Sequence, residues 1–317
     1  VIPGNEKDIE PLIGKGVLGF KAFLTHSGID EFPNVTEDDL RKTMPLIAKH
    51  GLPLLVHCEL SNTNPHPPLS TRHYPDYLAS RPKKWEDDAI AMMIRLCEEF
   101  NCRTHIVHLS SANSLQQIAE AKQRGLPLTV ETCQHYLYFN AEEIPEGRTE
   151  FKCAPPIREQ DNNFMLSQAL KFGLIDFVAT DHSPAPPEMK ELISGDFMKA
   201  WGGISAIQFS LPALWTATKK YGAILTDIAK WLCEKPAQLP QLKTKGKIAK
   251  GYDADLVVWA PDEKFTVTKD IILHRHKITP YLDESLYGVV KQTWLAGEKV
   301  YGGKFLHLNK GKILFHD

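Results

Sequence analysis

Apolar runs and amphipathic segments alternate along residues 1–240. The apolar runs are short and rich in Val, Ile, Leu and Phe, as in buried parallel strands, and they span 17–24, 52–57, 104–108, 127–131 and 175–181. The segments with helical spacing span 37–50, 86–100, 114–124 and 163–172, followed by 204–221 and 227–233. This alternation predicts a parallel sheet with helices on both faces. About five strand–helix units are present, fewer than the eight of a closed barrel, so either the sheet is open or the first units are missing.

The pattern changes around residue 241. Four short β-rich runs follow at 254–259, 264–268, 289–295 and 299–302, and Gly297-Glu298 stands where a hairpin turn is expected. We therefore predict two units, an α/β barrel-like unit over 1–240 and a smaller β-sandwich portion over 241–317.

Composition is typical of a globular enzyme and excludes some partners. Hydrophobic residues make up 43% of the chain, and 37 basic against 39 acidic residues give a net charge of −2. This balance provides no electrostatic footprint for nucleic acid or for an anionic membrane, and no apolar run reaches the ~20 residues of a membrane helix. The six cysteines form no C-x-x-C pair, which suits free thiols and a cytoplasmic location. The first residues carry no secretion signal and resemble a loop within a protein, so we expect the chain to be the remainder of a longer one.

Four strands carry a metal-binding or ionisable residue at or near their C-terminal ends, which meet at one edge of a parallel sheet. These residues are Lys21, His57, His108 and Asp181. A single histidine there is more often structural, but four such residues together indicate a metal site, because zinc and similar ions bind imidazole and carboxylate. Asp181 could both bind a metal and accept a proton from water. Its alternative role, a cap or turn residue before Pro184, leaves the adjacent His182 unexplained.

Lys21 and two loops are each open to two interpretations. Lys21 lies in an apolar strand, so its ammonium either extends to the surface or is desolvated, with a lowered pKa or a chemical modification. The loop 152–158 contains two prolines and the loop 201–204 two glycines, so both could present backbone groups to a ligand. A plain tight turn explains either loop equally well. Cys153 has no evident base partner and is a poor candidate nucleophile.

A series of motifs in chain order resembles the cyclic amidohydrolases, the family of hydantoinases, dihydropyrimidinases, dihydroorotases and allantoinases. The motifs are GFKAF with Lys21, VHCE with His57, VHLSS with His108, ETCQHY with His135, CAPPIR with Cys153, ATDHSPAPPEMK with Asp181, KAWGGI with Gly203, and GYDADLVVW. The resemblance covers essentially the whole chain. DHSPAPPEMK, KAWGGI and HRHKITPYL resemble the allantoinase branch more than the others.

The resemblance implies a fold and a site. The fold would be a (β/α)8 TIM-type barrel, here without its N-terminal strands, with a β-sandwich built from both chain ends. A carboxylated Lys21 would bridge two divalent metal ions, of which His57 and His108 would bind one, while Asp181 would bind the other and act as general base. Zinc is the expected metal, although manganese, cobalt and iron use the same ligands. The substrate-binding groups implied are the backbone near Ala154 and Gly203, together with Cys153 and His182.

This chain departs from the family pattern at two places. Hydantoinases stabilise the oxyanion with a tyrosine five residues after the bridging lysine, and that position is His26 here, which would reassign the role to an imidazole. The family's His-x-His metal motif does not occur upstream of Lys21. His274 and His276 match its spacing but belong to the β-rich region, so we do not take them as ligands. The chain is therefore expected to lack two ligands of the binuclear site.

The function implied is hydrolysis of allantoin to allantoate in purine catabolism, by a homo-oligomer, tetramer or dimer, acting on a small molecule. A hydantoinase or dihydropyrimidinase acting on a neighbouring ring is the first alternative. A metal-free scaffold homologue and a catalytically incomplete fragment are two others. The presence of Lys21, His57, His108 and Asp181 together argues against the scaffold, because such polar groups are costly without a catalytic role.

Overall fold

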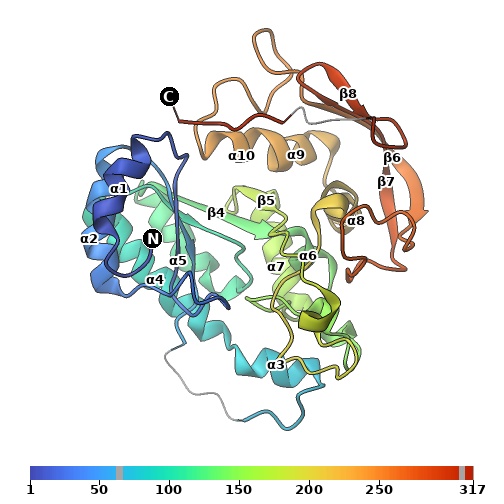
Figure 1. The fold of residues 1–317 in the computed structure, drawn as a ribbon, viewed down its shortest axis with the longest axis horizontal. Helices are drawn as coiled ribbons and strands as arrows, with labels where there is room; N and C mark the ends of the chain where they lie inside the picture. The colour runs from blue at the N-terminus through green and yellow to red at the C-terminus, as the bar shows by residue number, and fades with distance from the viewer. Residues whose placement is uncertain (62–66, 307–310, 317) are drawn as a thin grey trace.

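The computed structural model describes residues 1–61, 67–306 and 311–316. Its centre is a parallel sheet in the order β1-β2-β3-β4-β5, with helices around it (Figure 1). The strands are β1 (Phe20–Phe23), β2 (Leu54–His57), β3 (Thr104–Ile106), β4 (Leu128–Cys133) and β5 (Phe177–Ala179). Each strand pairs in parallel with the next one along the chain. The predicted parallel sheet of strand–helix units is therefore confirmed.

A helix follows each of the first four strands and returns the chain to the start of the next. The main crossover helices are α2 (Glu37–Lys49), α4 (Lys83–Phe100), α5 (Leu115–Gln123) and α7 (Gln160–Lys171). The start of α2 is fixed by a capping box, in which Thr36 Oγ1 accepts the Asp39 N–H and the Asp39 carboxylate accepts the Thr36 N–H. Its apolar positions Leu40, Met44 and Ile47 are buried, as their helical spacing predicts.

The other helices flank the sheet and its loops. They are α1 (Glu6–Ile13), α3 (Tyr74–Ser80), α6 (Gln134–Tyr138), α8 (Ser210–Lys219), α9 (Leu225–Ala229) and α10 (Lys235–Gln238). In Figure 1, α1, α2, α4 and α5 lie together along one flank, and α9 and α10 lie beyond β5. A π-helical turn over Lys230–Glu234 joins α9 to α10 and packs against β5. No helix in the described ranges is long and apolar enough to cross a membrane.

Two predicted helices have different bounds from those expected. The segment 204–221 begins with Ile204 in an isolated β-bridge to His182, so the α-helix starts only at Ser210, after a 3-10 turn. The prediction missed this because the bridge partner is distant in sequence. The helix expected at 227–233 begins earlier, at Leu225, and widens into the π-helical turn.

The C-terminal region forms an antiparallel sheet in the order β6-β7-β8, built from β6 (Leu256–Thr266), β7 (Ser285–Leu295) and β8 (Glu298–Tyr301). The two strands expected at 254–259 and 264–268 are one long strand, β6, whose register shifts between Ala260 and Lys264. The hairpin turn is Ala296-Gly297, both with positive φ, and Glu298 already begins β8. The division at 240/241 stays a prediction.

Both sheets contribute to one hydrophobic core. Val267, Ile272, Tyr281 and Leu286 are fully buried and belong to the same cluster as the residues of the parallel sheet. The helix α8 packs between the two regions, because it contacts both α6 and β7. The segment 271–281 consequently reaches the loops at the edge of the parallel sheet.

Candidate active site

Strand register places the candidate residues of β1 and β2 on one face of the sheet. Lys21 pairs with Leu55, and Phe23 pairs with His57. Since residues two apart in a strand point to the same side, Lys21 and His57 share a face. The half-buried Lys21 extends its Nζ over the Phe23 ring, 5.1 Å from the ring centroid, so a positive charge lies beside the end of β2.

His57 and His108 meet at the C-terminal edge of the sheet. His57 Nδ1 lies 3.0 Å from His108 Nε2, and the two rings are nearly perpendicular, with centroids 4.6 Å apart. His108 follows β3 in a left-handed conformation (φ 42°), which turns it toward His57. Burial lowers the pKa of His108 far below its usual value, and the electrostatic interactions with the His57 imidazole and the Lys21 ammonium lower it further. His108 is therefore a neutral imidazole, the form that binds metals.

Asp181 completes the set at the end of β5, also with positive φ (40°). Burial raises the pKa of its carboxyl, whereas the electrostatic interactions with Lys21 and with the His57 imidazole lower it. Asp181 is thus within electrostatic range of both residues. Within the described residues, no three His, Cys, Asp or Glu side chains are gathered closely enough to hold a metal ion. Two nitrogens converge, and Lys21 and Asp181 lie around them, so the residues present could provide part of a metal site.

The loop Lys152–Arg158 has nearly all its carbonyl groups engaged by the rest of the protein. Buried donors satisfy five of them: Lys190 Nζ to the Lys152 carbonyl, Tyr77 hydroxyl to Cys153, Tyr136 hydroxyl to Pro155, Ser110 hydroxyl to Pro156, and Tyr74 hydroxyl to Ile157. Ala154 differs from these neighbours. It alone in this loop is only half-buried, and its backbone groups have no hydrogen-bond partner among the described residues. The loop therefore presents the backbone of Ala154.

The glycine loop packs against Ala154 and depends on Gly203. A Cβ on Gly203 would lie 2.4 Å from Ser183 Oγ, so only glycine fits. The backbone N–H and carbonyl of Gly203 are already engaged, with the Trp201 carbonyl and with Lys190 Nζ. Gly202 is half-buried, and a Cβ there would lie 3.5 Å from the Ala154 Cβ. Gly202 and Ala154 thus lie next to each other, one from each loop.

The other predicted site residues occupy varied positions. His26 is largely exposed, with its Nδ1 accepting the Gly28 N–H at 3.1 Å and its Nε2 3.6 Å from Asp30. His182 Nδ1 accepts the Ala206 N–H at 3.0 Å. Cys153 is buried, and burial raises the pKa of its thiol to about 12, which is unfavourable for a nucleophile.

Sequence reasoning missed two residues near the site. Glu59 is fully buried and accepts a hydrogen bond from His57 Nε2 at 2.7 Å. Burial by itself would raise the pKa of Glu59, but the charge of Arg81 and the contact with His57 hold that pKa at about 2. His274 lies beside His182, with ring centroids 6.0 Å apart, although the two belong to different regions of the chain. The VHCE motif contained the signal for Glu59. The HRHKITPYL motif contained His274, but no local pattern indicated its position beside His182.

The sequence of this chain matches a known protein family. The model of the amidohydrolase family matches residues 14–300. The chain belongs to the amidohydrolase family. This amidohydrolase is 46% identical to the allantoinase of Streptomyces avermitilis over 318 residues, which cover 99% of this chain and 70% of that protein. It is 43% identical to the allantoinase of Arabidopsis thaliana, with 94% of this chain and 62% of the relative covered. The amidohydrolase chain thus spans about two thirds of the length of these curated relatives.

Solved structures of hydantoinases share the fold of this amidohydrolase. The L-hydantoinase (dihydropyrimidinase) from Arthrobacter aurescens matches with a TM-score of 0.88 at 27% identity, over 97% of this chain and 70% of that one. The D-hydantoinase (dihydropyrimidinase) from Thermus sp. matches with a TM-score of 0.86 at 25% identity, over 100% of this chain and 71% of that one. The predicted fold class, a TIM-type amidohydrolase barrel with a smaller β-sheet portion, is confirmed.

Proposed function

We propose that this chain carries the catalytic part of an allantoinase, which hydrolyses the ring amide of allantoin to give allantoate. The observation that carries the proposal is the convergence of His57 Nδ1 and His108 Nε2 beside Asp181 and Lys21. The identity to allantoinases, 46% and 43% over nearly the whole chain, supports this substrate. We propose that these residues hold a pair of divalent metal ions, with zinc expected.

Each residue has a role in this proposal. His57 and His108 would hold one metal ion, Asp181 would hold the other, and Lys21 would contribute to both sites as a carboxylated side chain. A bound divalent cation lowers the pKa of water from 15.7 to about 7 and polarises the ring carbonyl. Asp181 accepts the proton that water loses as its oxygen attacks the ring carbonyl carbon. Asp181 then returns that proton to the ring nitrogen as the C–N bond breaks.

The loops around Ala154 and Gly203 hold the substrate ring. The unpaired backbone groups of Ala154 can bond a ring amide, and the half-buried Gly202 allows the ring to approach closely, while Gly203 fixes the loop against Ser183. Cys153 contributes to substrate binding as a buried part of the loop that carries Ala154. His182 contributes through its contact with the backbone at Ala206. We assign oxyanion stabilisation to His26, which is largely exposed and follows β1, the strand that carries Lys21. A homo-oligomeric assembly and a cytoplasmic location complete the proposal.

The alternative is a hydantoinase or dihydropyrimidinase, which the similarity to the two hydantoinase structures favours. The deciding experiment measures metal content of the purified chain together with turnover of allantoin, hydantoin and dihydrouracil, with zinc and bicarbonate added. Bound metal with preferential allantoin turnover supports the proposal. Preferential hydantoin or dihydrouracil turnover favours the alternative, and no metal with no turnover indicates a catalytically incomplete fragment.

A further inference from the structure

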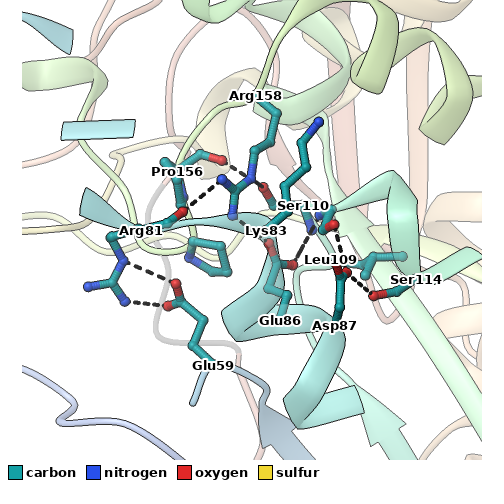
Figure 2. Close-up of polar contacts among 12 residues, drawn as sticks. Glu59, Arg81, Lys83, Glu86, Asp87, Leu109, Ser110, Ser114, Pro156 and Arg158 are labelled. Carbon is teal, nitrogen blue, oxygen red and sulfur yellow. Dashed lines mark hydrogen bonds and ion pairs between the residues drawn. The ribbon is translucent and has the colours of Figure 1, made fainter. Parts of the chain in front are cut away.

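Two buried carboxylates, those of Glu59 and Glu86, are each paired with an arginine (Figure 2). Glu59 follows β2 and is fully buried, and Glu86 lies on α4 and is 2% exposed. Arg81 forms a two-point contact with Glu59, with Nε 3.1 Å from Oε1 and Nη2 on Oε2. Arg158 Nη2 lies 3.0 Å from Glu86 Oε2. Buried ion pairs add little net stability, because desolvation offsets their attraction. Their placement beside the site therefore points to a positioning role.

Glu59 determines which nitrogen of His57 carries a hydrogen. Its Oε2 lies 2.7 Å from His57 Nε2, and an ionised carboxylate can only accept a hydrogen bond. His57 Nε2 is consequently the donor, which leaves the lone pair on Nδ1. That lone pair faces His108 Nε2 at 3.0 Å. The contact with Glu59 thus sets both the tautomer and the direction of the imidazole.

The Glu86–Arg158 pair holds the backbone that follows His108 and does not contact His57. Glu86 Oε1 accepts the backbone N–H groups of Ser110 and Ser111, at 2.9 and 3.1 Å, two and three residues after His108. Arg158 Nη1 donates to the Arg81 carbonyl at 2.8 Å, which links the two ion pairs (Figure 2). Glu86 therefore supports backbone, whereas Glu59 supports an imidazole.

We propose that Glu59, oriented by Arg81, is a positioning residue that keeps His57 in the Nε2–H tautomer with Nδ1 directed to the point it shares with His108. The inference rests on the proposed function only in taking a divalent cation as the ligand at that point. Arg81 contributes by fixing both carboxylate oxygens of Glu59. The pair thereby leaves one nitrogen of His57 available to a metal.

The experiment compares Glu59→Gln with Glu86→Gln, two changes of equally buried carboxylates that each face an arginine. Glu59 Oε2 contacts both His57 Nε2 and Arg81 Nη2, so either placement of the NH2 group in Glu59→Gln breaks one Arg81 contact. With the oxygen kept on Arg81 Nε, the NH2 group faces His57 Nε2 and makes it an acceptor, so His57 should shift to the Nδ1–H tautomer. Nitrogen NMR of histidine-labelled apo protein, with the signal assigned by His57→Asn, reports this directly. We expect zinc affinity, measured by competition with a chelator, to fall about 10–100-fold in Glu59→Gln. Glu86→Gln should lower the melting temperature while His57 keeps its wild-type tautomer.

An Nδ1–H tautomer in the wild-type protein, or the same tautomer in wild type and Glu59→Gln, would overturn the inference. If Glu59→Gln does not fold, Arg81→Lys provides the second variant, because lysine keeps the charge but lacks the two-point fork. Arg81→Lys should also weaken zinc binding, and unchanged affinity would count against the inference. The NMR measurement needs neither metal nor substrate. If His57 of the wild-type protein has the Nε2–H tautomer but the protein does not hydrolyse allantoin, the proposed function is wrong and the inference about Glu59 still holds.

Discussion

Lys190 Nζ lies 2.9 Å from the carbonyl oxygen of Gly203. The same ammonium donates to the carbonyls of Trp201, at 2.9 Å, and Lys152, at 3.1 Å. Lys190 is only 3% exposed, so these three acceptors take the place of its hydration shell. One buried lysine therefore joins the loop that carries Ala154 to the loop that carries Gly203.

Replacing Lys190 should weaken substrate binding. Lys190→Met leaves three carbonyl groups without their donor, each costing about 1–3 kcal/mol if it stays buried, and the two loops move apart. We expect KM to rise about tenfold or more, because small displacements of positioned groups can cost up to ~100-fold. Lys171→Met is the matched control, since Lys171 Nζ also donates to two carbonyls, of Tyr221 and Gly222, at an exposed place. An equal change of KM in both variants would contradict the role of Lys190.

The contribution of Lys190 to stability should depend on pH. Burial lowers the pKa of Lys190 from 10.5 to about 7. Between these values the unfolded chain binds a proton that the folded chain does not, so the free energy of unfolding increases with pH in this window. Below about pH 7 both states are protonated and the full cost of burying the cation is present. The free energy of unfolding of wild type relative to Lys190→Met should therefore rise from pH 7 to pH 10 in urea titrations. A pH-independent difference would show that the lysine stays charged.

The two adjacent glycines should respond differently to a methyl group. In Gly203→Ala the new Cβ would lie 2.4 Å from Ser183 Oγ and 2.8 Å from the Ser183 carbonyl oxygen, so the backbone must shift. We expect a loss of about 1–3 kcal/mol in free energy of unfolding, typical of overpacking. In Gly202→Ala the Cβ meets the Ala154 Cβ at 3.5 Å, the Ala154 nitrogen at 3.8 Å and Lys152 Cε at 4.0 Å, all of them ordinary contacts. That variant should keep its stability but show a raised KM, because the methyl group partly covers Ala154. Comparable stability losses in both variants would disprove this distinction.

Zinc should stabilise the chain through His57 and His108. Metal at 100 times its dissociation constant adds about 2.7 kcal/mol to a folded state that alone binds it. Melting curves with and without zinc should therefore show an upward shift for wild type that His57→Asn and His108→Asn each reduce. His50→Asn is the control, because His50 pairs with Glu10 far from the sheet edge that carries the site. An equal shift in all four proteins would place zinc elsewhere.

Strand and helix patterns in the sequence predicted much of the framework. The apolar runs identified each parallel strand, and the ends of those runs identified Lys21, His57, His108 and Asp181 as one group. The structure brings His57 Nδ1 and His108 Nε2 to 3.0 Å, and Asp181 within electrostatic range of Lys21 and His57. This works because a parallel sheet aligns its strand ends whatever the connecting segments contain.

The partners of these residues were decided by the tertiary structure. Glu59 is two residues after His57 in the chain, but its role depends on Arg81, which reaches it from the end of α3. Ala154 is distinguished only because Tyr77, Tyr136 and other buried donors take the neighbouring carbonyls. Likewise His274 lies beside His182 through the packing of the segment 271–281. Sequence periodicity determines which side of a strand or helix a residue faces, whereas the groups that it meets depend on how distant segments pack together.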